Sequence, residues 1–542
     1  MPMSLRTLAL VLGAGLLAAC GPSNGERECA GGATDTQSDP LNCGSCGVAC
    51  SDGFACIDGA CLAGECRPGT EESCYDGIAS TRDIGPCKGG TRTCDDTGRW
   101  APCLGQVVPQ GEDGARCTDG VDNNCNGAID ENEDRDGDGL TTCGGDCCDS
   151  TECGKPELVN LGSFDAPGNN FDDDCNGMVD DTLLLCDQGL ASNTTNALDF
   201  AKAIDICQTS TEQDSKWGVI SGSLSRTNGM GTPDPRGHAV RPRFGTGLLP
   251  QGGVSLAILS TGAAAGKGDQ NPAYTSFAGY THVGDQACPT FLGSTASGRS
   301  CAPYPADFLG ANNGVLPNAP GCEPPSTATL ANDPVMLTLR IRVPSNAKSF
   351  KLSSNFFSAE FPEYTCSPFN DFFVVLLDST YAGTPANPTD KNLAFYLPPG
   401  SADQVPVGVN LAFGNTGLFT QCVNGETGCS TSEPGSIATC TSTAHLTGTG
   451  FDDPSPGDCA TSSLVGGATG WLVTSGNVTP GEIITLRIAI WDTSDHILDS
   501  LAVIDGFQWS IDVAQPGTVI FKDKPVLDAL PRADVVSATV AR

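Results

Sequence analysis

The chain has 542 residues, and its 64 acidic and 28 basic side chains give a formal net charge of −36 at pH 7. That charge repels nucleic-acid phosphates, so a nucleic-acid-binding function is excluded and cations are favoured as partners. With 68 glycines and 37 prolines the chain stays below the content typical of non-periodic disorder. Its length suggests roughly three or four folded units.

The N-terminus predicts export. An apolar run, Leu8–Leu17, is too short to cross a ~30 Å bilayer as a permanent helix and is typical of a secretory signal, here residues 1–19. The run leads into Leu-Ala-Ala-Cys ending at Cys20, which resembles the lipobox of bacterial lipoproteins. The resemblance implies that Cys20 carries the lipid that holds the protein at a membrane, with residues 20–28 as a lipidated tether. Gly21 stands where many inner-membrane lipoproteins have Asp, so we expect an outer-membrane or cell-surface location.

Cysteine usage divides the chain into two parts. Besides Cys20 there are 28 cysteines, an even number that predicts disulfides in an exported protein. Twenty of them lie between Cys29 and Cys207, and the other eight follow. We expect residues 29–66 to form a Cys-rich knot within a small, covalently stabilised front part. No histidine lies in that part, so disulfides are favoured over zinc.

The strongest chemical signal is an acidic stretch with the spacing of a calcium loop. Between residues 112 and 181 there are 20 acidic and 3 basic side chains, which repel one another unless cations neutralise them. One segment fits the pattern D-x-[DN]-x-[DN]-G-x5-E, in which side-chain oxygens, one backbone carbonyl and a late Glu surround the ion. Its predicted ligands are Asp122, Asn124, Asn126, the carbonyl of Ala128, Asp130 and Glu133.

The pattern recurs twice. A second turn lacks the closing Glu, and a third is followed by a late Asp. Their predicted ligands are Asp134, Asp136, Asp138, Asp172, Asp174, Asn176 and Asp180. Residues 121–130 align with residues 171–180 at an offset of 50, which indicates an internal duplication. Apolar residues bracket each acidic turn, so we expect the two copies to pack against each other.

Oxygen ligands without histidine or thiolate favour Ca²⁺ over transition metals, and Mg²⁺ usually takes fewer protein ligands. The alternative is that these residues form solvated turns without metal, since Asp, Asn and Gly favour turns in any case. Three such turns in one short stretch favour metal binding. No helix flanks them as in an EF-hand.

The segment from Cys117 to Gly127, with the acidic turns that follow, resembles the MopE-like metal-binding repeat. The match extends over about residues 66–181, within an expected domain of residues 67–182, and includes Cys-Tyr, Gly-x-x-x-Cys and Trp-x-x-Cys segments upstream. The resemblance implies metal binding, and the namesake of the family binds copper. Because no histidine precedes His238, we expect calcium, with copper as the less favoured metal.

After a helix predicted over Asn196–Thr209, strands dominate. Leu337–Val343 alternates strictly, Phe372–Leu377 is apolar throughout, and Ile483–Trp491 and Leu501–Ile511 follow. Two packed antiparallel sheets are the natural solution. The predicted fold class is mainly β, with disulfide-rich loop and turn modules carrying acidic calcium-type loops, followed by a large antiparallel β-sandwich with long loops.

Three rear segments resemble the choice-of-anchor L domain of bacterial surface proteins. They are Gly253–Gly262, the stretch from Phe357 to Phe373, and Asp495–Ser500. The resemblance covers about residues 183–515 and leaves residues 516–542 as a C-terminal tail. It implies tethering to a cell surface, and the molecular activity of the family is generally unassigned.

A second metal site is predicted beside the strongly apolar strands. Its candidate residues are Glu360, Glu363, Asn370, Asp371, Asp495 and Asp499. Buried carboxylates need a cation or hydrogen-bond donors, so calcium is one interpretation. The other is that they cap turns by accepting backbone N–H groups.

The sequence favours binding over catalysis, because its four histidines stand alone and form no H-E-x-x-H motif. We expect a lipid-anchored outer-membrane protein whose calcium-binding loops stiffen a stalk. Its β-sandwich would serve adhesion or bind a surface polysaccharide or a protein. The alternatives are a scavenging protein for calcium or copper, and a surface-anchored hydrolase acting on polysaccharide.

Overall fold

The structure is a computed structural model that describes most of residues 26–520. Residues 1–25 and 521–542 lie outside the described residues, and with them the predicted signal, Cys20 and most of the C-terminal tail. The internal gaps are residues 30–31, 38–40, 50–53, 58, 64–65, 67–68, 96–98, 111–113, 131–133, 139, 149–152, 181–184, 280, 291–293, 323–329, 399–402, 429–436 and 454–465. In the part that is described, no helix combines the length and the apolar character that a membrane span requires.

The chain divides into two compact units, Met1–Val108 and Pro109–Arg542. Among its described residues, the first unit contains three antiparallel hairpins and a short 3-10 helix, η1 (Ala79–Thr81). The paired strands are β1 (Glu26–Cys29) with β2 (Gly32–Asp35), β3 (Phe54–Ile57) with β4 (Ala60–Ala63), and β5 (Glu71–Cys74) with β6 (Gly90–Thr93).

Disulfides hold these hairpins in place of a large core. The pairs within the described part of this unit include Cys43–Cys56, Cys66–Cys94 and Cys74–Cys103. Short strands with so little apolar surface gain most from cross-links that restrict the unfolded chain. The predicted disulfide-rich character of the front part is confirmed.

The second unit is built around two antiparallel sheets. The five-stranded sheet has the order β12-β13-β22-β15, with β7 also paired to β13. Its strands are β7 (Gly218–Ser225), β12 (Cys301–Pro303), β13 (Leu330–Arg342), β15 (Phe372–Asp378) and β22 (Ile483–Asp492).

The seven-stranded sheet has the order β24-β21-β14-β23-β9-β8, with β20 also paired to β14. Its strands are β8 (His238–Arg241), β9 (Leu256–Ser260), β14 (Ser349–Ser358), β20 (Gly467–Ala468), β21 (Leu472–Asn477), β23 (Ser500–Ser510) and β24 (Gly517–Ile520). The predicted β-rich fold class and the four predicted rear strands are therefore confirmed.

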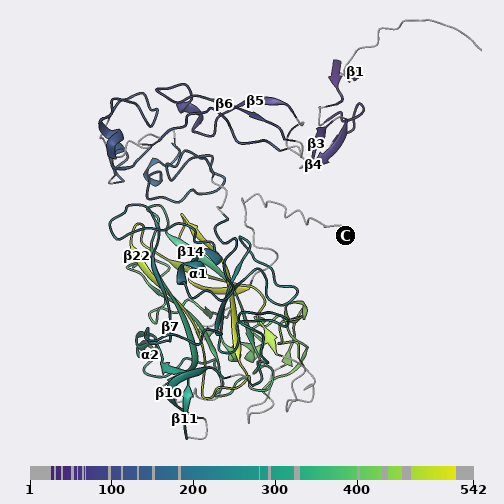
Figure 1. The fold of residues 1–542 in the computed structure, drawn as a ribbon, viewed down its shortest axis with the longest axis vertical. Helices are drawn as coiled ribbons and strands as arrows, with labels where there is room; N and C mark the ends of the chain where they lie inside the picture. Colours follow the sequence, from purple (N-terminus) through teal and green to yellow (C-terminus); the bar gives the residue numbers. More distant parts are fainter. Residues whose placement is uncertain are drawn as a thin grey trace, which may run out of the picture. The chain divides into compact units, whose positions relative to one another are not determined.

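Small hairpins and short helices decorate the sandwich. The hairpins pair β10 (Val283–Pro289) with β11 (Thr295–Arg299), β16 (Phe395–Tyr396) with β17 (Val405–Pro406), and β18 (Gly425–Glu426) with β19 (Ile437–Ala438). The β10–β11 hairpin extends from one end of the sandwich in Figure 1. The helices are α1 (Ala197–Ala203), α2 (Ala306–Ala311) and the 3-10 turns η2 (Gly114–Thr118), η3 (Thr142–Gly144), η5 (Pro156–Leu158), η6 (Val409–Asn415) and η7 (Ala444–Leu446).

The main core lies between the two sheets. Leu339 and Ile488 from one sheet and Phe350 and Ile504 from the other belong to the same fully buried cluster. Side chains alternate along each strand, so neighbouring residues face the opposite side. Trp491 accordingly packs in a second cluster on the outer face of the five-stranded sheet, under α2. Both faces of this sheet are therefore covered, which explains its continuous apolar runs.

The predicted helix over Asn196–Thr209 is shorter than expected. It begins after Asn196, whose side chain accepts a hydrogen bond from the N–H of Leu198, and it ends at Ala203. Asp205 has a φ of +72°, which an α-helix cannot accommodate. The apolar spacing of the sequence continued beyond this point because Ile204 and Ile206 enter the same core without helical backbone.

The last acidic repeat is joined to the sandwich. Phe164 belongs to the sandwich core cluster. Its N–H donates to Asn346 Oδ1 at 3.0 Å, and its carbonyl accepts from Asn346 Nδ2 at 2.8 Å. The expected boundary between residues 182 and 183 lies outside the described residues. The expected tail begins with β24, which pairs with β21.

An ion pair holds α2 against the five-stranded sheet, and it gives a first prediction. Arg487 donates to both carboxylate oxygens of Asp307, at 3.0 and 2.6 Å, and this pairing lowers the pKa of Asp307. We expect Asp307→Asn to lower the free energy of unfolding by about 1 kcal/mol at pH 7, a modest value because the pair is part-exposed.

Because the pKa of Asp307 is depressed on folding, its contribution is fully present above the unfolded-state value of about 4 and is lost as the pH falls through the lower folded-state pKa. In urea denaturation the wild type and the variant should therefore differ most at pH 7, and the difference should shrink steadily as the pH falls from about 4 toward the depressed folded-state pKa. Asp285→Asn, which removes the exposed partner of Arg226, is the control and should change nothing measurable. An unchanged difference at low pH would contradict this interpretation.

Candidate metal centre

The first acidic turn folds onto its own backbone. The carboxylate of Asp122 accepts hydrogen bonds from the N–H groups of Asn126 at 3.1 Å and Gly127 at 2.9 Å. Asn124 Oδ1 accepts from the same N–H of Asn126 at 3.1 Å, and Asn126 Oδ1 accepts from Ala128 N–H at 2.8 Å. Gly127 has a φ of +93°, a conformation that favours glycine. Oxygens of two predicted ligands therefore meet at one amide.

The third turn repeats this geometry almost atom for atom. Asp172 accepts from the N–H groups of Asn176 at 3.1 Å and Gly177 at 2.8 Å, and Asp174 Oδ1 accepts from Asn176 N–H at 3.2 Å. Asn176 Oδ1 accepts from Met178 N–H at 2.9 Å, and the φ of Gly177 is +92°. The internal duplication seen in the sequence is thus a duplication of backbone conformation.

The late acidic residues close their own loops. Asp130 and Asp180 both have left-handed backbones, with φ of +52° and +50°. The carboxylate of Asp130 accepts from Gly120 N–H at 3.1 Å, and Asp180 Oδ1 accepts from Gly168 N–H at 2.7 Å. Each therefore fastens the end of its turn to a backbone amide upstream. Glu133, the predicted closing ligand, lies outside the described residues.

The two copies do not pack through the apolar residues that bracket them. Val121, Ile129 and Met178 are 39%, 61% and 52% exposed, so the expected apolar contact is not formed by these side chains. The third repeat instead contacts the sandwich through Phe164. The apolar residues beside these turns are not buried, because hydrogen bonds of the turn residues themselves stabilise the turns.

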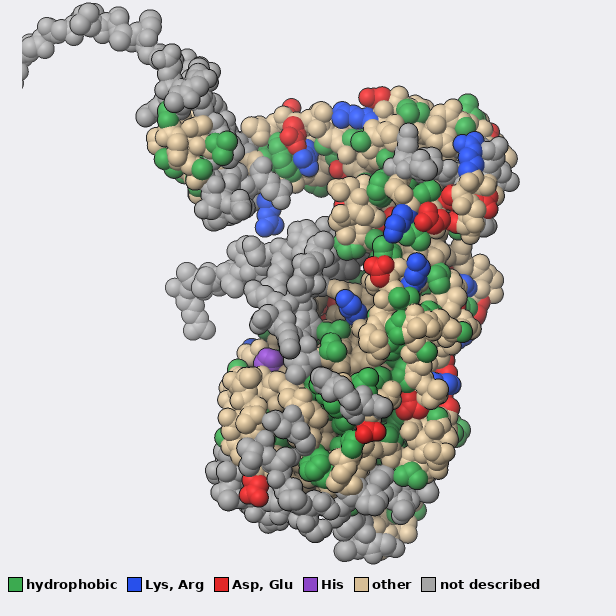
Figure 2. Space-filling model, turned by 180° about the vertical axis from the view of Figure 1, so that it is seen from behind, with side chains coloured by type: hydrophobic (Ala, Val, Ile, Leu, Met, Phe, Trp, Pro, Cys, Tyr) green, Lys and Arg blue, Asp and Glu red, His purple; other side chains and the backbone are tan. Residues whose placement is uncertain are grey.

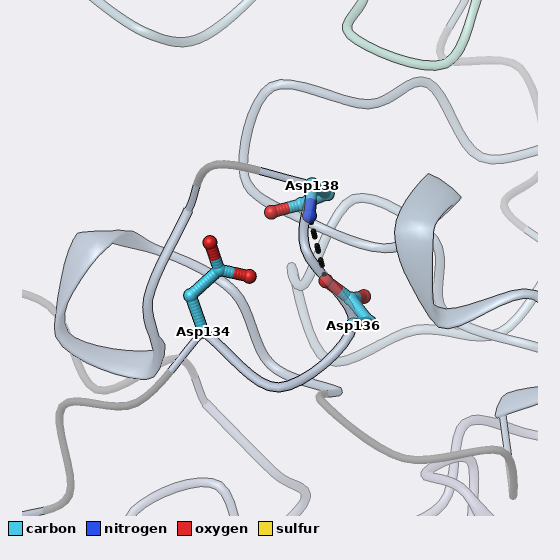
Figure 3. A group of neighbouring side chains, drawn as sticks. All are labelled: Asp134, Asp136 and Asp138. Atoms are coloured by element: carbon cyan, nitrogen blue, oxygen red, sulfur yellow. Dashed lines mark hydrogen bonds between the residues drawn. The ribbon is translucent and has the colours of Figure 1, made fainter.

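The second acidic turn brings three carboxylates together. Ligand oxygens of Asp134, Asp136 and Asp138 all lie within 4.8 Å of one another (Figure 3). Asp134 Oδ1 accepts from Gly137 N–H at 2.8 Å, and Asp136 Oδ1 accepts from Asp138 N–H at 3.0 Å. Partial burial raises the pKa of Asp138, and the neighbouring carboxylates raise it further. The turn therefore holds negative charges close together that a shared cation would neutralise.

This trio is linked to the repeat that docks on the sandwich. Asn160 Nδ2 donates to Asp138 Oδ2 at 3.0 Å, and Asn160 N–H donates to the carbonyl of Asp173 at 2.9 Å. One asparagine thus connects the second acidic turn to the third.

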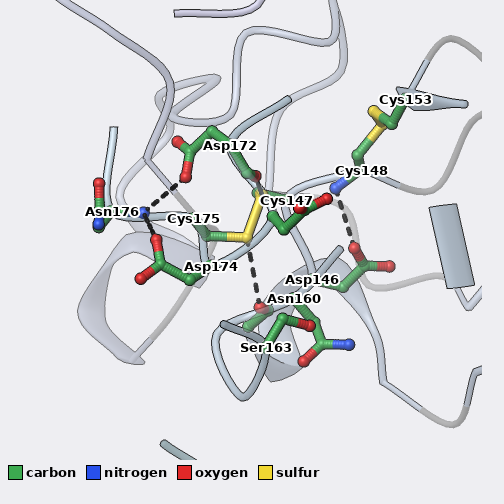
Figure 4. The surroundings of a disulfide bond; sticks show 12 residues. Asp146, Cys147, Cys148, Cys153, Asn160, Ser163, Asp172, Asp174, Cys175 and Asn176 are labelled. Carbon is green, nitrogen blue, oxygen red and sulfur yellow. Dashed lines mark hydrogen bonds between the residues drawn. A yellow bond between two sulfur atoms is a disulfide. The ribbon is translucent and has the colours of Figure 1, made fainter. Parts of the chain in front are cut away.

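A disulfide passes through the third turn. Cys175, between Asp174 and Asn176, is bonded to Cys147, and Figure 4 shows this bond among the carboxylates of Asp146, Asp172 and Asp174. Burial, together with the charge of Asp174, raises the pKa of Asp172 to about 8. The equivalent Cys125 of the first turn is also disulfide-bonded. These cysteines are thus structural and are not available as thiolate ligands.

The site is chemically an oxygen site. Its side chains supply carboxylate and amide oxygens, while no histidine precedes His238 in the sequence. Carboxylate and carbonyl oxygens suit hard divalent cations, whereas copper and zinc favour imidazole and thiolate ligands.

The residues predicted for a second site lie in the sandwich, and five of the six are at most 4% exposed. These five are Glu360, Glu363, Asn370, Asp371 and Asp499, while Asp495 is half-buried. Burial raises the pKa values of Glu360, Asp371 and Asp499 well above their usual range, and like charges nearby add to the effect.

Not all six residues serve one centre. Asn370 Oδ1 accepts from Asn410 N–H at 2.8 Å and so holds a neighbouring loop. Sequence reasoning missed two buried carboxylates in the same region, Asp333 and Asp492. Asp492 directly follows a predicted strand, just as Asp371 directly precedes one, so charged residues at strand ends were the available signal.

Comparison with known proteins identifies the repeats. A family model named for copper-binding MopE and described as a "putative metal-binding motif" matches three segments, residues 64–78, 107–131 and 157–181. The last two contain the duplicated turns described above. No curated protein and no solved structure matches the chain. The chain thus carries a metal-binding motif in three repeats, which supports metal binding and leaves the metal itself open.

The geometry separates turn-forming residues from candidate metal ligands, which gives a second prediction. Asp172→Ala removes the acceptor of two backbone amides, so we expect a loss of about 1–3 kcal/mol in unfolding free energy even with chelator present. Asp134→Ala removes one exposed bond and should cost less than about 0.5 kcal/mol under the same conditions.

Chemical denaturation of the mature chain, followed by circular dichroism in excess chelator, measures both effects. If Asp172→Ala were neutral without metal, the turn would depend on a cation for its shape.

Proposed function

We propose that this protein is an exported, lipid-anchored binding protein whose acidic repeats hold Ca²⁺. The bound ions would stiffen the segment that carries the β-sandwich, and the sandwich would serve adhesion or partner binding. The observation that carries the proposal is the group of Asp134, Asp136 and Asp138, with ligand oxygens within 4.8 Å of one another. Such spacing allows several carboxylates to share one cation. The matches to a metal-binding motif on either side of this turn support the same conclusion.

Calcium is proposed over copper because of the donor atoms. Calcium takes six to eight oxygen ligands in flexible geometry, which suits turns rich in carboxylate and amide oxygens. The copper of the family's namesake would favour nitrogen or sulfur donors. Cys117, Cys125 and Cys175 in this region are all disulfide-bonded.

The contacts suggest how a bound ion would stiffen the chain. A cation on the second turn would fix Asp138, and Asn160 connects Asp138 to the third repeat. Phe164 of that repeat is inserted into the sandwich core. Neutralising the trio would thus extend a rigid path from the acidic turn to the β-sandwich.

The anchoring and the surface role remain proposals that rest on the sequence. The lipobox-like end of residues 1–19 supports lipidation of Cys20, and the choice-of-anchor L resemblance supports a cell-surface location at the outer membrane. On the face drawn in Figure 2, acidic and basic side chains lie interspersed. A polysaccharide or protein partner would accordingly recognise shape more than a uniform charge on that face.

A third prediction concerns the metal. Isothermal titration of the mature protein with calcium should detect binding at or below about 1 mM, the range of extracellular calcium modules. We expect Asp134→Asn/Asp136→Asn to weaken the corresponding site at least about tenfold, equal to about 1.4 kcal/mol. The control, Glu157→Gln/Asp214→Asn, removes the same charge from exposed positions and should change affinity less than about twofold.

The same titration with Cu²⁺ tests the alternative. Copper binding with no calcium binding would replace the calcium proposal with copper scavenging. Binding of both metals without any gain in thermal stability would favour storage over stiffening.

A fourth prediction concerns the anchor. Cys20→Ser should remove incorporation of labelled palmitate and move the protein from the membrane fraction to the soluble fraction of the cells that export it. Ser23→Ala, a neighbouring change of similar size, is the control and should leave both unchanged. Continued membrane association of Cys20→Ser would reject the lipid anchor.

A further inference from the structure

Two carboxylates meet at one end of the five-stranded sheet. β15 begins directly after Asp371 and β22 ends at Asp492, and the antiparallel register places these two positions side by side. Phe373 and Ile490 both point into the core between the sheets. Because side chains alternate along a strand, Asp371 and Asp492 point into the same space, at the end of that core.

The seven-stranded sheet brings a third carboxylate to the same place. Ser500, the first residue of β23, donates its Oγ–H to Asp371 Oδ2 at 2.7 Å, and Asp499 immediately precedes it. Asp499 lies so close to the backbone of Gly262 that a Cβ at residue 262 would clash with the Asp499 carboxylate. A glycine at that position is therefore needed for the carboxylate to lie where it does. The three acidic groups come from both sheets.

This end of the core is buried and crowded with carboxylates. Asp371, Asp492 and Asp499 are 0%, 1% and 0% exposed. Glu360, which interacts with Asp371, is 2% exposed. Neither carboxylate oxygen of Asp499 has a hydrogen-bond partner among the residues that the structure describes. The nearby His496 is engaged with a different carboxylate, Asp333, at 2.9 Å. Burying ionised carboxylates in this way is strongly unfavourable without a cation.

We propose that this end of the sandwich binds a hard divalent cation of the calcium class, with Asp371, Asp492 and Asp499 as carboxylate ligands and Glu360 lining the site. The hydrogen bonds that Asp371 accepts from Ser500 and from Thr493 N–H, the latter at 3.2 Å, orient it toward the other two. The bound ion would join the two sheets of the sandwich. The site is independent of the acidic repeats.

Binding should draw these groups inward. In the described part of the chain, the ligand oxygens of these groups do not all lie within 4.8 Å of one another, whereas those of Asp134, Asp136 and Asp138 do. Calcium–oxygen distances of about 2.3–2.6 Å require closer approach. Trp491, adjacent to Asp492 and stacked on Phe372 with ring centroids 5.6 Å apart, would sense that movement.

Terbium luminescence tests the proposal, because Tb³⁺ replaces Ca²⁺ and is excited by a nearby indole. In the mature protein we expect Tb³⁺ emission on tryptophan excitation, displaced by Ca²⁺. Trp491→Phe should remove most of it. Asp499→Asn should weaken Tb³⁺ and Ca²⁺ binding at this site at least about tenfold. The variant Asp134→Asn/Asp136→Asn should keep the Trp491-dependent signal, which separates this site from the repeats.

Thermal melting shows whether the Asp499→Asn variant is folded. In chelator this variant should melt at the same temperature as the wild type or higher, because one repelling charge is gone, and it should gain less from calcium. If neither Trp491→Phe nor Asp499→Asn reduced the Tb³⁺ emission, the proposal would be overturned. If calcium did not raise the melting temperature of the repeat variant Asp134→Asn/Asp136→Asn, the proposal would also be overturned. Protons would then compensate the buried carboxylates.

Discussion

Burying a carboxylate is unfavourable unless a hydrogen-bond donor, a cation or a proton compensates its charge, and this protein buries many. In the duplicated turns the donors are backbone amides. Asp122 and Asp172 each accept two of them, and the chain is bent so that these amides point inward. The acidic sequence thus shapes its own backbone before any ion is considered, which explains why two turns 50 residues apart share one conformation.

Disulfides keep that conformation in a part of the chain with little apolar material. Cys125 and Cys175 have left-handed backbones, with φ of +57° and +60°, which is unusual for residues other than glycine. Both are cross-linked, and Cys175 reaches Cys147 across the turn. Covalent bonds here take the structural role that a hydrophobic core has in the sandwich.

The two candidate cation sites solve the same electrostatic problem differently. The trio of Asp134, Asp136 and Asp138 is part-exposed, so water and salt reduce its repulsion and an ion can exchange with solvent. The carboxylates at the sandwich end are shielded from water, and their repulsion acts at low effective dielectric. An ion in the first place would stiffen a turn, whereas an ion in the second would join two sheets.

The sequence by itself determined the β-rich class, the disulfide-rich front, the four main rear strands and the duplicated acidic turns. These features depend on local alternation and spacing, which a single segment carries. Tertiary structure alone decided the rest. It ended the helix at Ala203, left Ile129 exposed, docked Phe164 into the sandwich, and brought Asp492 beside Asp371. Such outcomes depend on contacts between segments far apart in the chain, and no local pattern encodes those contacts.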